Sequence, residues 1–134
     1  MPLVIWNKKD SVGVKELDDQ HQGLINFLNR LHASSMIGRA REVADPALPR
    51  LLKLAAEHFT AEEKLMESIR FPRLAAHRVK HREMTEKLEE IVSSHEKGDS
   101  AVYVQLLYFT RNILVRHIHE EDQEYAQWIS AHGV

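Results

Sequence analysis

Seven residues of this 134-residue chain are of types that bind metal ions and stand at spacings that could bring them together. They are His21, His58, Glu62, His77, His81, His117 and Asp122. The chain has no cysteine, so a metal would have to be held by imidazole and carboxylate, which suit first-row transition metals. Five imidazoles and two carboxylates are enough donors for two ions. The sequence therefore predicts a two-metal site, if the fold brings these side chains together.

Four segments of the sequence carry apolar residues at helical spacing, and glycine or proline lies between them. The predicted helices cover about 18–37, 46–70, 72–97 and 99–131. Alternation of period two is absent, so strands have no support. Short connections favour antiparallel neighbours. We therefore expect an all-α fold, a single domain over 1–134 built as an up-down-up-down antiparallel four-helix bundle.

The predicted helix starts rest on capping residues. Asp18 is a candidate N-cap for the first helix, and Asp45 with Pro46 in the first turn is a candidate start for the second. Residues 1–17 are expected to form a non-helical N-terminal arm. Trp6 of that arm is expected to pack on the bundle.

Helix phase directs the candidate ligands inward, and axial height places them at one level. Residues four apart share a helix face, and His21 and His81 lie in the apolar rows of their helices. At about 1.5 Å per residue, His21, Glu62, His77 and Asp122 lie roughly 5, 10, 8 and 12 Å from the same end of the bundle. The same arithmetic excludes four other histidines, which are too far along the axis or point away. They are His32, His95, His119 and His132.

Composition narrows the functional classes. The net charge is −2, which gives no electrostatic reason to expect nucleic acid or an acidic membrane as a partner. The first residues lack the pattern of a signal peptide, and no apolar run approaches the roughly 20 residues of a membrane span. We expect a cytoplasmic protein, free-standing and monomeric.

Counting coordination positions suggests what a two-metal site would do. Two first-row ions with about six donors each offer about twelve positions. Five imidazoles, two bridging carboxylates and a bridging oxide or hydroxide fill about eleven of them. A single vacancy suits a small ligand such as O2 better than a bulky substrate, and two iron(II) ions can each donate one electron to it.

The order of the motifs resembles that of the hemerythrins, and the arm with Val12-Gly13-Val14 resembles that of bacterial members. Four elements match in order over nearly the whole chain. They are DxQH ending at His21, HFxxEExxM from His58, HxxxH from His77 to His81 and HIxxxD from His117 to Asp122.

The resemblance implies a di-iron centre with an oxo or hydroxo bridge. One iron would be held by His77, His81 and His117 and the other by His21 and His58. Glu62 and Asp122 would bridge the two ions. O2 would bind end-on, as hydroperoxide, at the two-histidine iron. The ligand pocket would include Phe59, Ile113, Leu114, Ile118 and Tyr125.

Two positions test this resemblance. Many members carry a Trp-Leu pair where this chain has Ile113-Leu114, so the bulky indole is missing from the pocket. Glu121 is four residues after His117 and satisfies a generic helix spacing, whereas the family pattern selects Asp122. Glu63, next to Glu62, is expected to be solvated. Phe59 and Met66 are expected to be core residues.

Three functions follow in order of preference. The first is reversible O2 binding for storage, delivery or sensing, with no turnover, and an oxygen-consuming enzyme is a candidate partner. The second is a di-iron enzyme with weak peroxidase, oxidase or NO-reducing activity, although the Glu-x-x-His pairs of ferritin-like di-iron sites are absent. The third is an iron-storage or metal-binding regulatory module, which could bind zinc.

Overall fold

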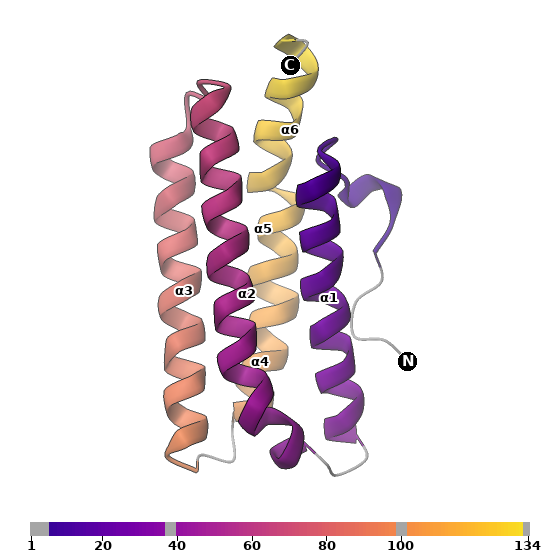
Figure 1. The fold of residues 1–134 in the computed structure, drawn as a ribbon, viewed down its shortest axis with the longest axis vertical. Helices are drawn as coiled ribbons and strands as arrows, with labels where there is room; N and C mark the ends of the chain where they lie inside the picture. The colour runs from indigo at the N-terminus through magenta and orange to yellow at the C-terminus, as the bar shows by residue number, and fades with distance from the viewer. Residues whose placement is uncertain (1–5, 37–39, 99–101, 133–134) are drawn as a thin grey trace.

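The chain folds into an antiparallel bundle of four helical arms, seen side by side in Figure 1. The structure is a computed structural model that describes residues 6–36, 40–98 and 102–132. The first three arms are α1 (Lys15–Met36), α2 (Ala40–Ser68) and α3 (Leu74–Glu96). The fourth consists of α4 (Val102–Tyr108), η2 (Phe109–Leu114), α5 (Val115–His119) and α6 (Glu121–His132), stacked end to end. The described residues contain no strand, so the predicted all-α, up-down-up-down bundle is confirmed.

The sequence predicted a non-helical N-terminal arm, but the arm contains one short helical turn. Lys8–Asp10 form a 3-10 turn, η1, capped by the side chain of Asn7. The first helix starts at Lys15, so Asp18 lies in its first turn and is not its N-cap. Its carboxylate instead accepts hydrogen bonds from Ser11 Oγ and from the backbone N–H of Val12, at 2.5 and 2.8 Å. Asp18 therefore fixes the arm to α1.

The predicted start of the second helix is also wrong. α2 begins at Ala40 and carries Pro46 and Pro49 inside it. A proline cannot donate the helical hydrogen bond, and its ring crowds the preceding turn, so a bend is expected there. The lower end of α2 bends away from the bundle axis in Figure 1. The Asp45 carboxylate does not cap α2 but contacts His95 Nε2 of α3 at 2.6 Å.

The fourth arm is not one regular helix. Phe109–Leu114 form a π-helical segment, and a turn at Glu120 separates α5 from α6. Thr110 is fully buried, and its hydroxyl donates to Leu106 O at 2.9 Å. Such a side-chain bond to the preceding turn competes with the helical ladder and bends helices. Residues 99–101 of the predicted fourth helix lie outside the described part of the chain. So do residues 1–5 of the predicted arm and residue 37 of the predicted first helix.

The core consists of two apolar clusters with the polar candidate residues between them. The larger cluster includes Leu24 and Ile25 of α1 and Phe59 of α2, with Trp6 packed against it as expected. The smaller cluster contains Val12, Leu17, Met66, Phe71 and Tyr125. Along α1 the order is Leu17, His21, Leu24, and along α2 it is Phe59, Glu62, Met66. The buried polar residues therefore form a layer that is sealed by apolar side chains above and below.

Among the described residues, no helix is long and apolar enough to cross a membrane.

Candidate metal centre

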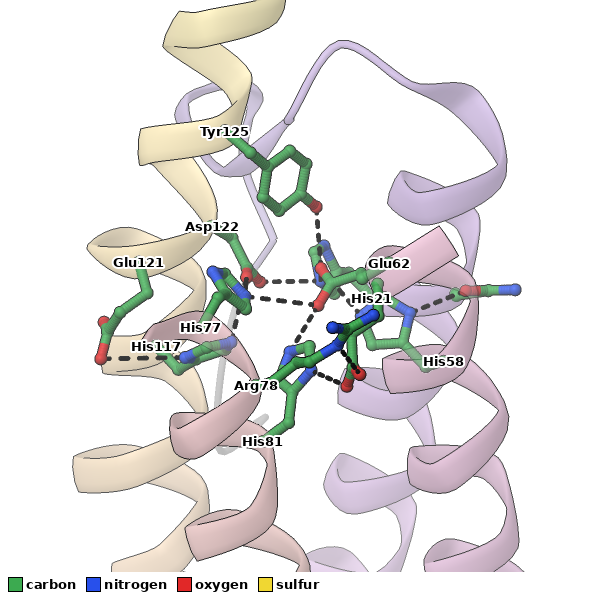
Figure 2. Close-up of polar contacts among 12 residues, drawn as sticks. His21, His58, Glu62, His77, Arg78, His81, His117, Glu121, Asp122 and Tyr125 are labelled. Atoms are coloured by element: carbon green, nitrogen blue, oxygen red, sulfur yellow. Dashed lines mark hydrogen bonds and ion pairs between the residues drawn. The ribbon is translucent and has the colours of Figure 1, made fainter. Parts of the chain in front are cut away.

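All seven candidate ligands lie in one buried layer. Each is at most 4% exposed, and they come from α1, α2, α3, α5 and α6. Figure 2 shows the histidines directed toward Glu62 and Asp122. The donor atoms form two sets. Within each set all atoms lie within 4.8 Å of one another, and both sets contain these two carboxylates. One set adds His77, His81 and His117, and the other adds His21 and His58.

Glu62 presents one oxygen to each histidine group. Its Oε2 lies 3.0 Å from His21 Nε2 and 3.2 Å from His58 Nε2. Its Oε1 lies 2.9 Å from His81 Nε2 and 3.8 Å from His77 Nε2. A carboxylate with its two oxygens directed to different donor sets has the arrangement of a bridge between two cations.

Asp122 has the same arrangement from the opposite side. Its Oδ1 lies 2.9 Å from His77 Nε2 and 3.0 Å from His117 Nε2, and its Oδ2 lies 3.1 Å from His21 Nε2. Glu121, the alternative by generic spacing, is only partly buried, and its Oε1 lies 3.8 Å from the outward-facing His117 Nδ1. The structure therefore turns Asp122, not Glu121, into the cluster.

Several of these atoms have no hydrogen-bond partner within the described part of the chain. The unpaired atoms include Nε2 of His58, His77 and His117 and both oxygens of Asp122. Each of these nitrogens lies within ion-pair distance of a Glu62 or Asp122 oxygen, and the donor atoms of each set lie within 4.8 Å of one another, so they face common points. Leaving such an atom buried and unpaired costs about 1–3 kcal/mol. Cations at the two convergence points would satisfy these atoms, so the donor set fits metal ions.

The buried charges shift the pKa values of the cluster. Burial lowers the pKa of His21, but its contacts with Asp122 and Glu62 outweigh burial and raise the pKa to about 9. The same balance raises the pKa of His77 to about 9. Burial raises the pKa of Glu62, yet its hydrogen bond with His21 and its close contact with the His58 imidazole bring the pKa well below its usual value. Without metal, His21 and His77 are therefore protonated partners of ionised carboxylates at neutral pH.

The pKa of Asp122 is also lowered. Burial and the nearby Glu62 charge raise this pKa, but the charge of His117 and the close contacts of His117 and His21 with the carboxylate lower it by more. Tyr125 is fully buried, and its hydroxyl donates to Glu62 Oε2 at 2.7 Å. Burial, followed by the Glu62 and Asp122 charges, raises the pKa of Tyr125, so the phenol keeps its proton and continues to donate.

Two side chains outside the cluster contact the outer nitrogens of the histidines. His58 Nδ1 lies 2.7 Å from Gln20 Oε1, and His81 Nδ1 lies 2.8 Å from Glu63 Oε2. An outer acceptor of this kind keeps the proton on Nδ1, so that the Nε2 lone pair points inward. Glu63 also accepts from Arg78 Nε at 3.1 Å. The expectation that Glu63 is simply solvated is therefore wrong.

The only sequence signal for these two acceptors is that each stands next to a candidate ligand. Gln20 precedes His21, and Glu63 follows Glu62, but each contacts a histidine of a different helix. The pairing depends on which helices are adjacent, and neighbouring positions alone do not show that.

The expected pocket residues surround the cluster on two sides. Phe59 stacks on His81 with ring centroids 4.2 Å apart and 15° between the planes. Leu114 and Ile118 are buried in the larger apolar cluster, while Tyr125 covers the cluster from the other side. Ile113 is partly buried and lines a cavity of about 470 Å³ that also reaches His117.

The four excluded histidines lie outside the cluster. His95 pairs with Asp45, and His132 Nδ1 lies 2.9 Å from Trp128 O. His119 is half exposed and contacts Asp10 of the arm at 2.5 Å. His32 is partly exposed, and neither donor set includes it.

Comparison with known proteins agrees with this geometry. Residues 12–129 match the family model described as the hemerythrin HHE cation binding domain. The chain belongs to the hemerythrin family. The match spans most of the chain, including all seven candidate ligands, and the family description states a cation-binding role.

Similar hemerythrin-family proteins come from diverse organisms. The chain is 28% identical over 132 residues to the bacteriohemerythrin of Stenotrophomonas maltophilia, covering 98% of this chain and 85% of that protein. It is 27% identical to the bacteriohemerythrin of Methylococcus capsulatus, covering 98% of this chain and 100% of that one. For the bacteriohemerythrin of Aquifex aeolicus the identity is 28%, with 97% and 88% covered.

Proposed function

We propose that this chain binds O2 reversibly at a pair of non-haem iron ions. His77, His81 and His117 would hold one ion, His21 and His58 would hold the other, and Glu62 and Asp122 would be shared by both. The observation that carries the proposal is the pair of donor sets that share the same two buried carboxylates. Family membership and the bacteriohemerythrin relatives support iron and O2 as the metal and the ligand.

The unequal histidine sets indicate where the ligand binds. Three imidazoles lie on one side of the carboxylates and two on the other, so an ion on the second side would have one fewer protein ligand and room for a small ligand. Two ferrous ions held there would supply the electrons that O2 takes up when it binds. This asymmetry supports O2 binding on the side of His21 and His58, where the ligand would bind end-on.

The surrounding residues keep the site dry and rigid. Phe59, Leu114 and Ile118 are at most 4% exposed, so bulk water has little access to the layer. Tyr125 holds Glu62 in place through its 2.7 Å hydrogen bond. Exclusion of water and a nearly filled coordination sphere favour binding and release of O2 over oxidation of a substrate. We therefore propose a binding protein for storage, delivery or sensing, and not an enzyme.

Metal content and visible spectra test the proposal. The anaerobically purified protein should contain two irons per chain and develop a visible band with O2 that disappears under argon, over repeated cycles. His58→Ala should lose the two-iron centre, whereas the matched histidine variant His95→Ala should keep it. A colourless protein that holds one zinc ion would contradict the proposal, as would equal losses in the two variants.

A further inference from the structure

A groove between α1 and α2 has the size and lining of a ligand site. It encloses about 690 Å³, within the range of roughly 300–1,000 Å³ that is typical of small-molecule pockets. Leu24 and Phe27 of α1 and Leu54 of α2 supply apolar walls. None of these three residues belongs to either donor set of the metal centre. The groove therefore reaches the metal centre only at its His58 end, while its apolar walls lie outside both donor sets.

Charge is distributed unevenly along this groove. α1 and α2 are antiparallel, as Figure 1 shows, and Gln20 and His58 line the same end. Arg30 lies ten residues after Gln20, and Arg50 lies eight residues before His58, so both are about 12–15 Å from that end. Arg30 and Arg50 thus line the far end of the groove from two facing helices. Glu57 adds a negative charge at the end near His58.

Gly23 gives the groove an open wall. A Cβ atom built at this position would meet nothing within 4 Å, so the glycine is not required by tight packing. Glycine disfavours a helix interior, and this one lies in the third turn of α1. Its absence of a side chain leaves room in the groove between Gln20 and Phe27.

We propose that this groove binds a free medium-chain fatty acid. The carboxylate pairs with Arg50, at the end of the groove that Arg30 also lines, and the hydrocarbon tail lies along Leu24, Phe27 and Leu54 toward the Gln20–His58 end. Arginine pairs with carboxylates in a planar, two-point geometry, and an apolar tail gains from leaving water. A cationic amphiphile would place its charge against the arginines and is disfavoured.

Calorimetric titration of the purified protein with decanoate, below the concentration at which it forms micelles, tests the proposal. We expect saturable binding of one decanoate per chain, weaker binding of decanol and no binding of decyltrimethylammonium. Arg50→Gln removes a charge-assisted hydrogen bond and should weaken decanoate binding by about tenfold or more. Lys53→Gln makes a matched charge change on the same helix at an exposed residue outside the groove lining, and should leave binding unchanged.

A second pair of variants separates a filled groove from a damaged fold. Gly23→Leu should block decanoate by occupying the groove, while Gly23→Ala, which adds only a methyl group, should retain binding. Both substitutions favour the helix, so unchanged circular dichroism is expected for each. The proposal is overturned if decanoate fails to saturate, if decanol binds equally well, or if Arg50→Gln and Lys53→Gln behave alike.

Discussion

Replacement of Glu63 by alanine should weaken metal binding although Glu63 is not a candidate ligand. Its Oε2 accepts from His81 Nδ1 at 2.8 Å, and the His81 side chain is only 3% exposed. Without that acceptor, the imidazole loses the group that keeps its proton on the outer nitrogen. Loss of such an outer contact reduces metal affinity by about 10–100-fold. That factor corresponds to about 1.4–2.8 kcal/mol.

Glu67 provides a matched control on the same helix. Like Glu63, it contacts the Arg78 guanidinium, at 3.6 Å from Nη2, but its side chain is 71% exposed. Glu67→Ala therefore makes the same change of charge and volume near the same arginine without contact to His81. We expect its metal affinity to match that of the unmodified protein. Glu63→Gln keeps an acceptor oxygen and should recover part of the lost affinity.

Anaerobic competition with a coloured iron(II) chelator measures these affinities, and thermal unfolding of the metal-free variants shows whether the fold is intact. An affinity for Glu63→Ala equal to that of the unmodified protein would refute the idea that the outer carboxylate orients His81. So would a loss of affinity in Glu67→Ala of the same size. An equal drop in the unfolding temperature of both Glu63 variants, with no recovery by glutamine, would show that Glu63 acts only through stability.

Three other predictions follow from the layer of buried charges. Tyr125→Phe removes a hydrogen bond to a buried carboxylate and should lower the free energy of unfolding of the metal-free protein by about 1.5–3 kcal/mol, measured by urea titration. Because the pKa values of His21 and His77 are about 9, both are protonated at pH 7 without metal and must release those protons to become ligands. Calorimetry in buffers of different ionisation heat should show that proton release, and the metal affinity should rise between pH 7 and 9; an affinity independent of pH would contradict this. Asp122→Asn should lose the second metal ion while Glu121→Gln retains both, as measured by metal analysis, and the reverse result would assign the bridge to Glu121.

Helical periodicity predicted the four arms because the apolar stripe of each is long and regular. The ends of the helices depend on competition between local and tertiary contacts, which the pattern does not contain. Asp45 has the sequence features of a cap, but the α3 residue His95 takes its carboxylate. Asp18 has the same features and instead binds the arm through Val12 N–H. In both cases the aspartate predicted to cap a helix instead contacts a residue outside that helix.

The level of the candidate site was predictable because rise per residue is nearly constant. His21 and Asp122 are 101 positions apart, yet simple axial arithmetic places them together, and the structure puts their side chains 3.1 Å apart. The roles of Gln20 and Glu63 were not predictable in this way. Each reaches a histidine on another helix, so its role depends on lateral packing and not on height.

The fourth arm shows why spacing alone could not choose between Glu121 and Asp122. In a regular helix, residue 121 lies about 40° from the direction of His117, and residue 122 lies about 140° away. The observed backbone is not regular there, because a turn at Glu120, with φ −108° and ψ −73°, separates α5 from α6. This turn resets the helical phase, so that His117 and Asp122 both face the layer. The irregularity that ends the long helix is therefore also what directs the second shared carboxylate into the site.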